Sequence, residues 1–354
     1  MRSGEMVRIG GGAGFWGDSS EGPRQLVLHG NINYLVLDYL AEVTMSILAK
    51  ARRKDPALGY ATDFLTEVIR PLAVEIHRRG IKVVCNAGGV NPQSCCDAIV
   101  AELAKQGVPL KVACVTGDDA MHVLDGKDRE KIREMATGSA LPPSMVSASA
   151  YLGAFPVAEA LAQGADIVVT GRCADSAVAV GALIHEFGWK PHDLDALAGG
   201  SLAGHVIECG PQSSGGFFTD WKLVADTWSS IGFPIVECFA DGSFVATKAE
   251  GTGGLVSLAT VSEQITYETG DPANYILPDV VLDMTGIRVE ETGKDRVRVS
   301  GVRGKPPTPT YKVSGTWIAI RKPLPGVLVT VIFPLCSFRK SLVSASPIPD
   351  DDDI

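Results

Sequence analysis

Five short apolar runs in this chain each end in a cluster of glycine and polar residues. The runs are rich in β-branched residues, as in Ile81-Lys-Val-Val84 and Asp166-Ile-Val-Val169, and such runs are typical of buried parallel strands. In open α/β sheets, ligands bind beyond the carboxyl ends of the strands. We therefore expect the five clusters to form one shared site: residues 10–18, 85–91, 116–119, 170–176 and 208–216.

Strands and helices alternate through the first two-thirds of the sequence. The expected strands are 34–38, 81–84, 110–115 and 167–169, and the expected helices are 39–50, 62–77, 92–105, 146–163 and 175–187. This alternation predicts an α/β fold with a mostly parallel, Rossmann-like sheet and helices on both faces. A closed βα barrel also fits, but we favour the open sheet because short strands joined by turns interrupt the repeat after Phe233.

The expected organisation has three parts. Residues 1–232 form the parallel α/β core with its glycine-rich loops, and residues 233–316 form a smaller α+β segment of the same domain. Residues 317–354 follow neither pattern and end in the acidic run Asp350 to Asp353, so we expect a poorly ordered tail. The length of 354 residues is ample for a large hydrophobic core.

Composition narrows the possible partners and the compartment. The net charge is −9 and no basic patch stands out, so we do not expect nucleic acid as a partner. The eight cysteines are scattered, which favours a reducing compartment and a cytoplasmic protein. No apolar stretch is long enough to span a membrane, and the start of the chain does not resemble a signal peptide. A homo-oligomer is compatible with these features.

The first loop is dense in glycine and can bring backbone N–H groups close to an anion. Its candidate substrate-binding residues are Gly12, Gly14, Trp16 and Asp18. The loop lacks the GxGxxG fingerprint at the required place and the lysine of a GxxxxGK[ST] loop, which disfavours a nicotinamide enzyme. The alternative is a turn that needs glycine only for steric reasons.

The segment Thr170-Gly-Arg-Cys-Ala-Asp-Ser176 carries the strongest candidates. Arg172, at a strand end, can clamp a carboxylate or a phosphate, and Asp175 can transfer a proton. Thr170 and Ser176 are candidate substrate contacts. The alternative is structural: Asp175 caps the following helix and pairs with Arg172.

Glu208 is the preferred general base, because burial at a strand end often raises the pKa of a carboxyl group. On a strand His205 would face the opposite way, so we do not expect it to share a site with Glu208. Gln212 and Gly215 follow and could supply donors to a substrate carbonyl, or form a flexible hinge. Asp38, at the end of the second strand, is either a helix cap or a catalytic residue.

Two more loops carry polar candidates. Asn86, Gly88 and Asn91 could hold a polar ligand, and Asn91 is also a plausible helix N-cap. Asp118 and Asp119 could bind a divalent metal, or could simply cap a turn. No other cofactor is indicated.

Taken in order, these motifs resemble those of the acyclic terpene utilisation (AtuA) family. The resemblance covers about residues 7 to 315. The matching motifs are Gly11-Gly-Ala-Gly-Phe-Trp-Gly-Asp-Ser19, Asn86 to Pro92, Val115 to Asp119, Thr170 to Ser176, His205 to Gly210, Gly215 to Trp221, Lys248 to Gly254, Glu263 to Glu268, Asp271 to Tyr275 and Pro278 to Val280. Residues 317–354 depart from the family pattern.

The resemblance implies a role in the breakdown of citronellol- or geraniol-type acyclic terpenes, which proceeds through acyl-CoA intermediates. It suggests a small-molecule substrate, a CoA thioester, and a carbon–carbon lyase step on a branched hydroxyacyl-CoA. In this hypothesis Arg172 holds the substrate, Glu208 or Asp175 moves a proton, and the glycine loops stabilise an enolate. The alternative is a non-catalytic subunit that binds an acyl-CoA in the same pocket. The resemblance itself assigns no catalytic residues.

Overall fold

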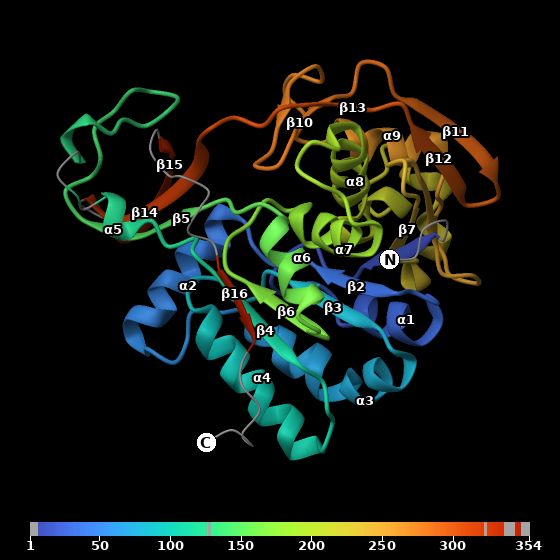
Figure 1. Cartoon of the computed structure of the whole chain (residues 1–354), viewed down its shortest axis with the longest axis horizontal. Helices are drawn as coiled ribbons and strands as arrows, with labels where there is room; N and C mark the ends of the chain where they lie inside the picture. Colours follow the sequence, from blue (N-terminus) through green and yellow to red (C-terminus); the bar gives the residue numbers. More distant parts are fainter. Residues whose placement is uncertain (1–5, 125, 127–128, 322–323, 336–343, 348–354) are drawn as a thin grey trace.

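The computed structural model describes residues 6–124, 126, 129–321, 324–335 and 344–347. Its centre is a ten-stranded sheet with the strand order β11-β12-β8-β7-β1-β2-β3-β6-β4-β16 (Figure 1). Five neighbouring strands in this sheet run parallel to one another. They are β1 (Val7–Gly11), β2 (Tyr34–Leu37), β3 (Lys82–Cys85), β6 (Ile167–Thr170) and β4 (Val112–Thr116). The α/β class with a large, mostly parallel central sheet is thus confirmed.

Antiparallel strands flank the parallel ones on both sides. Next to β1 lie four strands from the later part of the chain: β7 (Pro234–Cys238), β8 (Phe244–Lys248), β12 (Arg296–Ser300) and β11 (Arg288–Gly293). On the other side β16 (Ser344–Pro347) pairs with β4. The segment beyond residue 233 therefore extends the central sheet, and the narrower Rossmann-like description stays a prediction.

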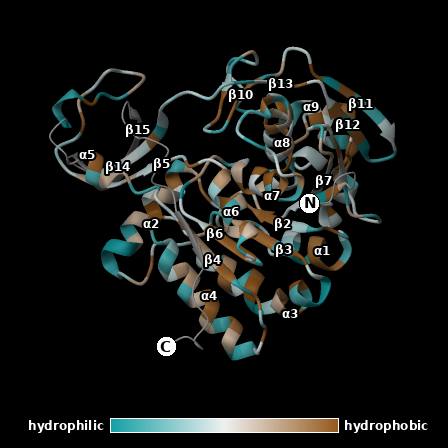
Figure 2. Ribbon diagram, in the orientation of Figure 1, coloured by the Kyte–Doolittle hydropathy of each residue, from teal (hydrophilic) through white to brown (hydrophobic). Residues whose placement is uncertain are grey.

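Helices cover both faces of the sheet. Successive strand residues point to opposite sides, and because both sets are apolar here, each face must be covered. In β2, Tyr34 and Val36 belong to one core cluster, and Leu35 and Leu37 to another. The first cluster packs on α6 (Phe155–Ala162), α7 (Ala177–Phe187) and α8 (Leu194–Ile207). The second packs on α1 (Glu21–His29), α2 (Glu42–Lys54), α3 (Arg70–Arg79) and α4 (Pro92–Gln106). Figure 2 shows the hydrophobic residues gathered on the sheet and on the inner faces of these helices.

The expected helix at 146–163 is wrong in its first part. Met145–Ala150 forms strand β5, and the helix begins only at Phe155. The strand pairs antiparallel with β14 (Tyr311–Arg321), a partner more than 150 residues away in the chain. This long-range pairing overrides the weak helical tendency of a run of small residues.

The expected strand through His205 is also wrong, since Leu194–Ile207 is helix α8. Eleven of its residues are buried, so the helix shows no polar face and no visible 3.6-residue pattern. Gly199, Gly200 and Gly204 lie against neighbouring backbone or side chains, which lets the helix sit inside the core. The reading of 204–210 as a strand mistook a buried helix end for a strand end.

The other expected helices are present with shifted ends. Helix α2 starts at Glu42 rather than residue 39, and α7 starts at Ala177 rather than residue 175. The helix expected at 62–77 begins as a π-helical turn, Phe64–Ile69, and continues as α3 with Pro71 in its first turn. Gly80 and Gly107 end their helices in the left-handed conformation, as expected. Helix α1 was not predicted.

Smaller elements complete the described structure. A three-stranded sheet contains β13 (Arg303–Lys305), β10 (Val281–Asp283) and β9 (Tyr275–Ile276), and a second contains β15 (Leu324–Leu335), β14 and β5. The short helices α5 (Met121–Leu124) and α9 (Leu258–Thr266) lie outside the sheets. Residues 336–343 and 348–354, with the acidic run Asp350 to Asp353, lie outside the described residues.

Gly11 sets how closely α8 approaches the end of β1. A Cβ atom there would lie 2.3 Å from the carbonyl oxygen of Ile207. We expect Gly11→Ala to lower the free energy of unfolding by about 1–3 kcal/mol, because the helix must move away from the strand. Urea unfolding measures this, with Gly270→Ala as control because its Cβ would meet nothing within 4 Å. An equal loss in both variants would contradict the close-packing argument.

Candidate functional site

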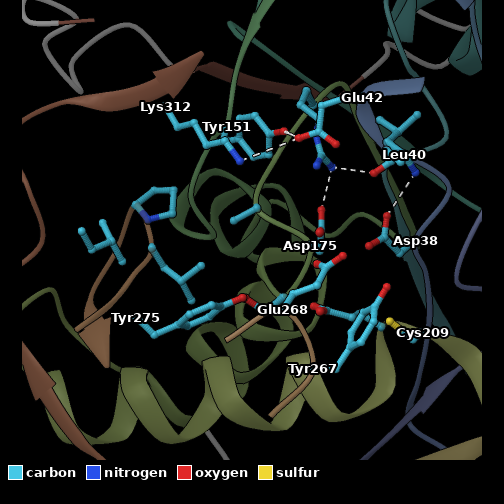
Figure 3. A pocket seen from close by; sticks show the side chains of 18 of the residues that line it. Asp38, Leu40, Glu42, Tyr151, Asp175, Cys209, Tyr267, Glu268, Tyr275 and Lys312 are labelled. Atoms are coloured by element: carbon cyan, nitrogen blue, oxygen red, sulfur yellow. Dashed lines mark hydrogen bonds and ion pairs between the residues drawn. The ribbon is translucent and has the colours of Figure 1, made fainter. Parts of the chain in front are cut away.

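A cavity of about 400 Å³ lies beyond the carboxyl ends of β1, β2 and β6 (Figure 3). The loops after these strands contribute Gly14, Asp38, Arg172 and Asp175, and the end of α8 contributes Glu208. The rest of the lining comes from Tyr151, the start of α2, and residues 267–268, 275–278 and 308–312. The loops after these three strands therefore meet at one cavity, as the topology of a parallel sheet predicts.

Arg172 is buried at the floor of this cavity, with 3% of its side chain exposed. Its Nη1 atom donates to the carbonyl oxygen of Leu40 at 2.8 Å and to Oδ1 of Asp175 at 2.6 Å. Its guanidinium carbon lies 4.2 Å from the centre of the Tyr151 ring, a cation–π distance. The pairing in the structural alternative is therefore present, since the guanidinium already holds the carboxylate of Asp175. The expected helix cap is wrong, because the N-cap of α7 is Ser176 and no side chain caps this helix.

His205 and Glu208 form a buried pair, which corrects the expectation that they face opposite ways. Nδ1 of His205 lies 2.7 Å from Oε1 of Glu208, because three residues span about one helical turn at the end of α8. Burial raises the pKa of Glu208, and His205 offsets only part of this effect. Burial lowers the pKa of His205, but the charge and hydrogen bond of Glu208, together with Gln264 and Glu268, raise it overall. The two groups therefore titrate as a pair that can hold a proton between them.

Asp38 lies at the end of β2 and is oriented by Asn86. The amide Nδ2 of Asn86 donates to Oδ1 of Asp38 at 2.6 Å. The amide oxygen Oδ1 of Asn86 accepts from the backbone N–H of Tyr39 at 2.7 Å. Burial and the nearby charge of Asp175 raise the pKa of Asp38. Asn86 is fully buried and does not line the cavity, so it positions Asp38 instead.

Several lining residues were missed by the sequence argument. The hydroxyl of Tyr151 donates to Glu42, and Nζ of Lys312 lies 3.7 Å from the same carboxylate. Tyr275 and Glu268 lie in motifs of the AtuA-like pattern, which could have flagged them. Tyr151 directly follows β5 and Lys312 lies on β14, two strands that meet only in the fold, so no local signal pointed to these residues.

The loops after β3 and β4 open onto a different cavity, of about 520 Å³. Asn91, Asp118 and Asp119 line it. Asn91 does not cap α4 with its side chain, because its amide donates instead to the carbonyl oxygens of Pro56 and Leu58. The five loops therefore do not surround a single cavity.

Asp118 and Asp119 are engaged with the backbone in this second cavity. Oδ2 of Asp118 accepts from the N–H of Arg172 at 2.9 Å, and Oδ1 of Asp119 accepts from the N–H of Met121 at 2.9 Å. Burial raises the pKa of Asp118 to about 7. Within the described part of the chain, no group of three or more His, Cys, Asp or Glu side chains is arranged to hold a metal.

The remaining candidates support the loops or lie apart from the cavity. Ser176 lines the cavity, and Asp18 fixes the first loop by accepting from the N–H of Gly14 at 2.9 Å. Asp18 itself lies outside the lining of the first cavity, as do Gly12, Trp16, Gly88, Thr170, Gln212 and Gly215. Gly88 binds the carbonyl oxygen of Thr170 through its N–H, so these two residues join the β3 and β6 loops.

The cavity can support acid–base chemistry by its carboxyl groups. Burial raises the pKa of Cys209 and of Cys173 to about 12, so both remain thiols at neutral pH and are poor nucleophiles. Glu208 with His205, and Asp175 with Arg172, offer two carboxyl groups held by different partners. Different environments for two carboxyls in one site are the usual basis for separate acid and base roles.

Comparison with known proteins gives one assignment. The family model described as acyclic terpene utilisation family protein AtuA matches residues 7–320. No curated protein and no solved structure matches the chain. Among the described residues, no helix is both long and apolar enough to cross a membrane. With most of its length matched by this family model, the chain belongs to the AtuA family, whose role is in acyclic terpene utilisation.

Proposed function

We propose that the protein is a carbon–carbon lyase that cleaves a branched 3-hydroxyacyl thioester, such as a CoA ester, by acid–base catalysis. The observation that carries this proposal is the buried His205–Glu208 pair at one wall of a cavity that also holds Asp175 and Tyr275. Membership of a terpene utilisation family supplies the branched acyl group as the substrate class.

In the proposed reaction, Glu208 removes the proton of the tertiary 3-hydroxyl group. The bond between C2 and C3 then breaks, C3 becomes a ketone, and the electron pair forms the enolate of an acetyl thioester. The phenol of Tyr275, whose pKa burial raises, remains protonated and can donate a hydrogen bond to the enolate oxygen. The His205–Glu208 pair then returns the proton it took to C2, so that no proton is gained or lost.

The lining of the cavity suits an acyl chain of this kind. Leu40, Ala41 and the run Ile276 to Pro278 supply apolar surface, while the carboxyl groups come from the strand ends. A volume of about 400 Å³ is within the range of small-molecule sites but too small for a whole CoA ester. We therefore place only the acyl end inside the cavity and the nucleotide end outside it.

The purified chain should cleave 3-hydroxy-3-methylbutanoyl-CoA, or a longer-chain homologue, to acetyl-CoA and a ketone. Mass spectrometry detects both products, and the 3-deoxy analogue is the control because it has no hydroxyl proton to remove. Cleavage of the hydroxy ester alone supports the proposal. Binding of these esters without any turnover would instead support the accessory acyl-CoA-binding subunit, and absence of both would contradict each role.

A further inference from the structure

The charges around the first cavity are strongly unbalanced. Among the described residues that line it, five are acidic and two are basic. The acidic residues are Asp38, Glu42, Asp175, Glu208 and Glu268, and the basic ones are Arg172 and Lys312. Such a site favours a neutral or cationic group over an anion.

Both basic side chains already face carboxylates. Arg172 lies 2.6 Å from Asp175, and Lys312 lies 3.7 Å from Glu42. Each also lies over the ring of Tyr151, at 4.2 and 4.6 Å from its centre. An incoming carboxylate would have to compete for these cations with groups that are already in place.

Glu42, Asp175 and Glu208 each lie opposite a basic side chain, and the buried Asp38 is held by Asn86, whereas Glu268 has neither kind of partner among the ion pairs and hydrogen bonds of the described residues. It is exposed, follows α9, and adopts a left-handed backbone conformation with φ of 57°. Figure 3 shows its side chain between Asp175 and Tyr267, within the ring of residues around the cavity. Its negative charge also raises the pKa of Glu208 and of Tyr275, which indicates that it faces the same interior.

We propose that Glu268 is a specificity-determining residue that rejects free terpenoid carboxylates and so reserves the cavity for neutral acyl derivatives. This inference rests on the proposed function, because it takes a branched acyl group to be the ligand. It adds the residue that excludes the free acid, so that the protein acts on the thioester alone. The reaction that supplies its substrate must therefore be one that converts a carboxylate to a thioester.

The test compares three probes that share one hydrocarbon chain and differ at the carbonyl: 3,7-dimethyloct-6-enoate, its primary amide and its N-acetylcysteamine thioester. Calorimetric titration of the full chain should show that the amide and the thioester bind. The acid should bind at least about tenfold more weakly than either. Raising the salt concentration should reduce this difference, because the Glu268 carboxylate is exposed to solvent.

Three variants assign the effect to the charge of Glu268. In Glu268→Gln the acid should bind about tenfold more tightly while the amide changes by less than about twofold. Glu268→Asp keeps the charge and should reject the acid as the unaltered chain does. Glu290→Gln removes an exposed carboxylate on β11, outside the cavity, and should change nothing.

The outcomes separate this inference from the proposed function. If the unaltered chain binds the acid and the amide equally tightly, or if Glu268→Gln does not raise the affinity for the acid, the selectivity inference is overturned. The acyl-binding cavity then still stands. If none of the three probes binds, the branched acyl ligand itself is wrong, and the proposed function falls together with the inference.

Discussion

Asp118→Asn should stabilise the protein by about 4 kcal/mol at pH 8 and by close to nothing at pH 4. Burial raises the pKa of Asp118 from an ordinary value of 3.8 to about 7 in the folded chain. Between these two values the folded state holds a proton that the unfolded state has released, so stability falls as the pH rises. Asparagine has no proton to lose, and the stability it confers is independent of pH in this range.

The shape of the site allows this replacement. The asparagine carbonyl can accept the N–H of Arg172, as Oδ2 of Asp118 does at 2.9 Å. The Ser149 hydroxyl beside Asp118 can rotate to accept from the new amide group. The variant therefore removes the titrating proton without leaving a buried donor unpaired.

Urea unfolding at several pH values measures the difference between the two proteins. Using the difference cancels the contributions of all other titrating groups. Asp119→Asn is the matched control, because Asp119 is an exposed neighbour that keeps its bond to the N–H of Met121. A difference for Asp118→Asn that does not grow with pH would show that Asp118 is ionised in the folded state throughout.

The parallel half of the sheet could be predicted because each strand there is a short, largely apolar run with its own local signal. Ile167–Thr170, for example, is buried at every position and is followed at once by a glycine turn. The antiparallel strand β5 gave no such signal, since Met145–Ala150 alternates small apolar residues with serine. Its structure depends on β14, which only the folded chain brings beside it.

The candidate site was predictable in its strand-end part and not in the rest. Arg172, Asp175 and Ser176 follow β6 directly, so the topology of a parallel sheet places them at the correct edge. Tyr151 and Lys312 enter the cavity from the β5–β14 pair, and Glu268 enters from the end of α9. The His205–Glu208 pair was missed for a different reason: it depends on α8 being a helix, and a helix buried on all sides has no pattern to read.

Glu208→Gln should lower kcat for the proposed lyase reaction by about 10²- to 10⁴-fold, the usual effect of removing a general base. The glutamine carbonyl can still accept a hydrogen bond from His205, so the pair keeps its geometry and loses only its ability to take the substrate proton. Substrate binding, measured as Kd, should change little, because the proposed contact with Glu208 acts on the reacting proton.

The pH dependence distinguishes this role from a structural one. Because the pKa of Glu208 is raised, the unaltered enzyme should lose activity on the acid side at a pH above the ordinary glutamate value of 4.5. In Glu208→Gln the acid-side fall should disappear from the residual rate.

Glu290→Gln, on the surface strand β11, again serves as the matched control and should keep full activity. Thermal unfolding at pH 8 checks that Glu208→Gln remains folded, as expected if the glutamine keeps the hydrogen bond to His205. A well-folded Glu208→Gln protein with undiminished kcat would exclude Glu208 as the base and leave the proton transfer to Asp175, whose carboxylate Arg172 holds on the same cavity wall.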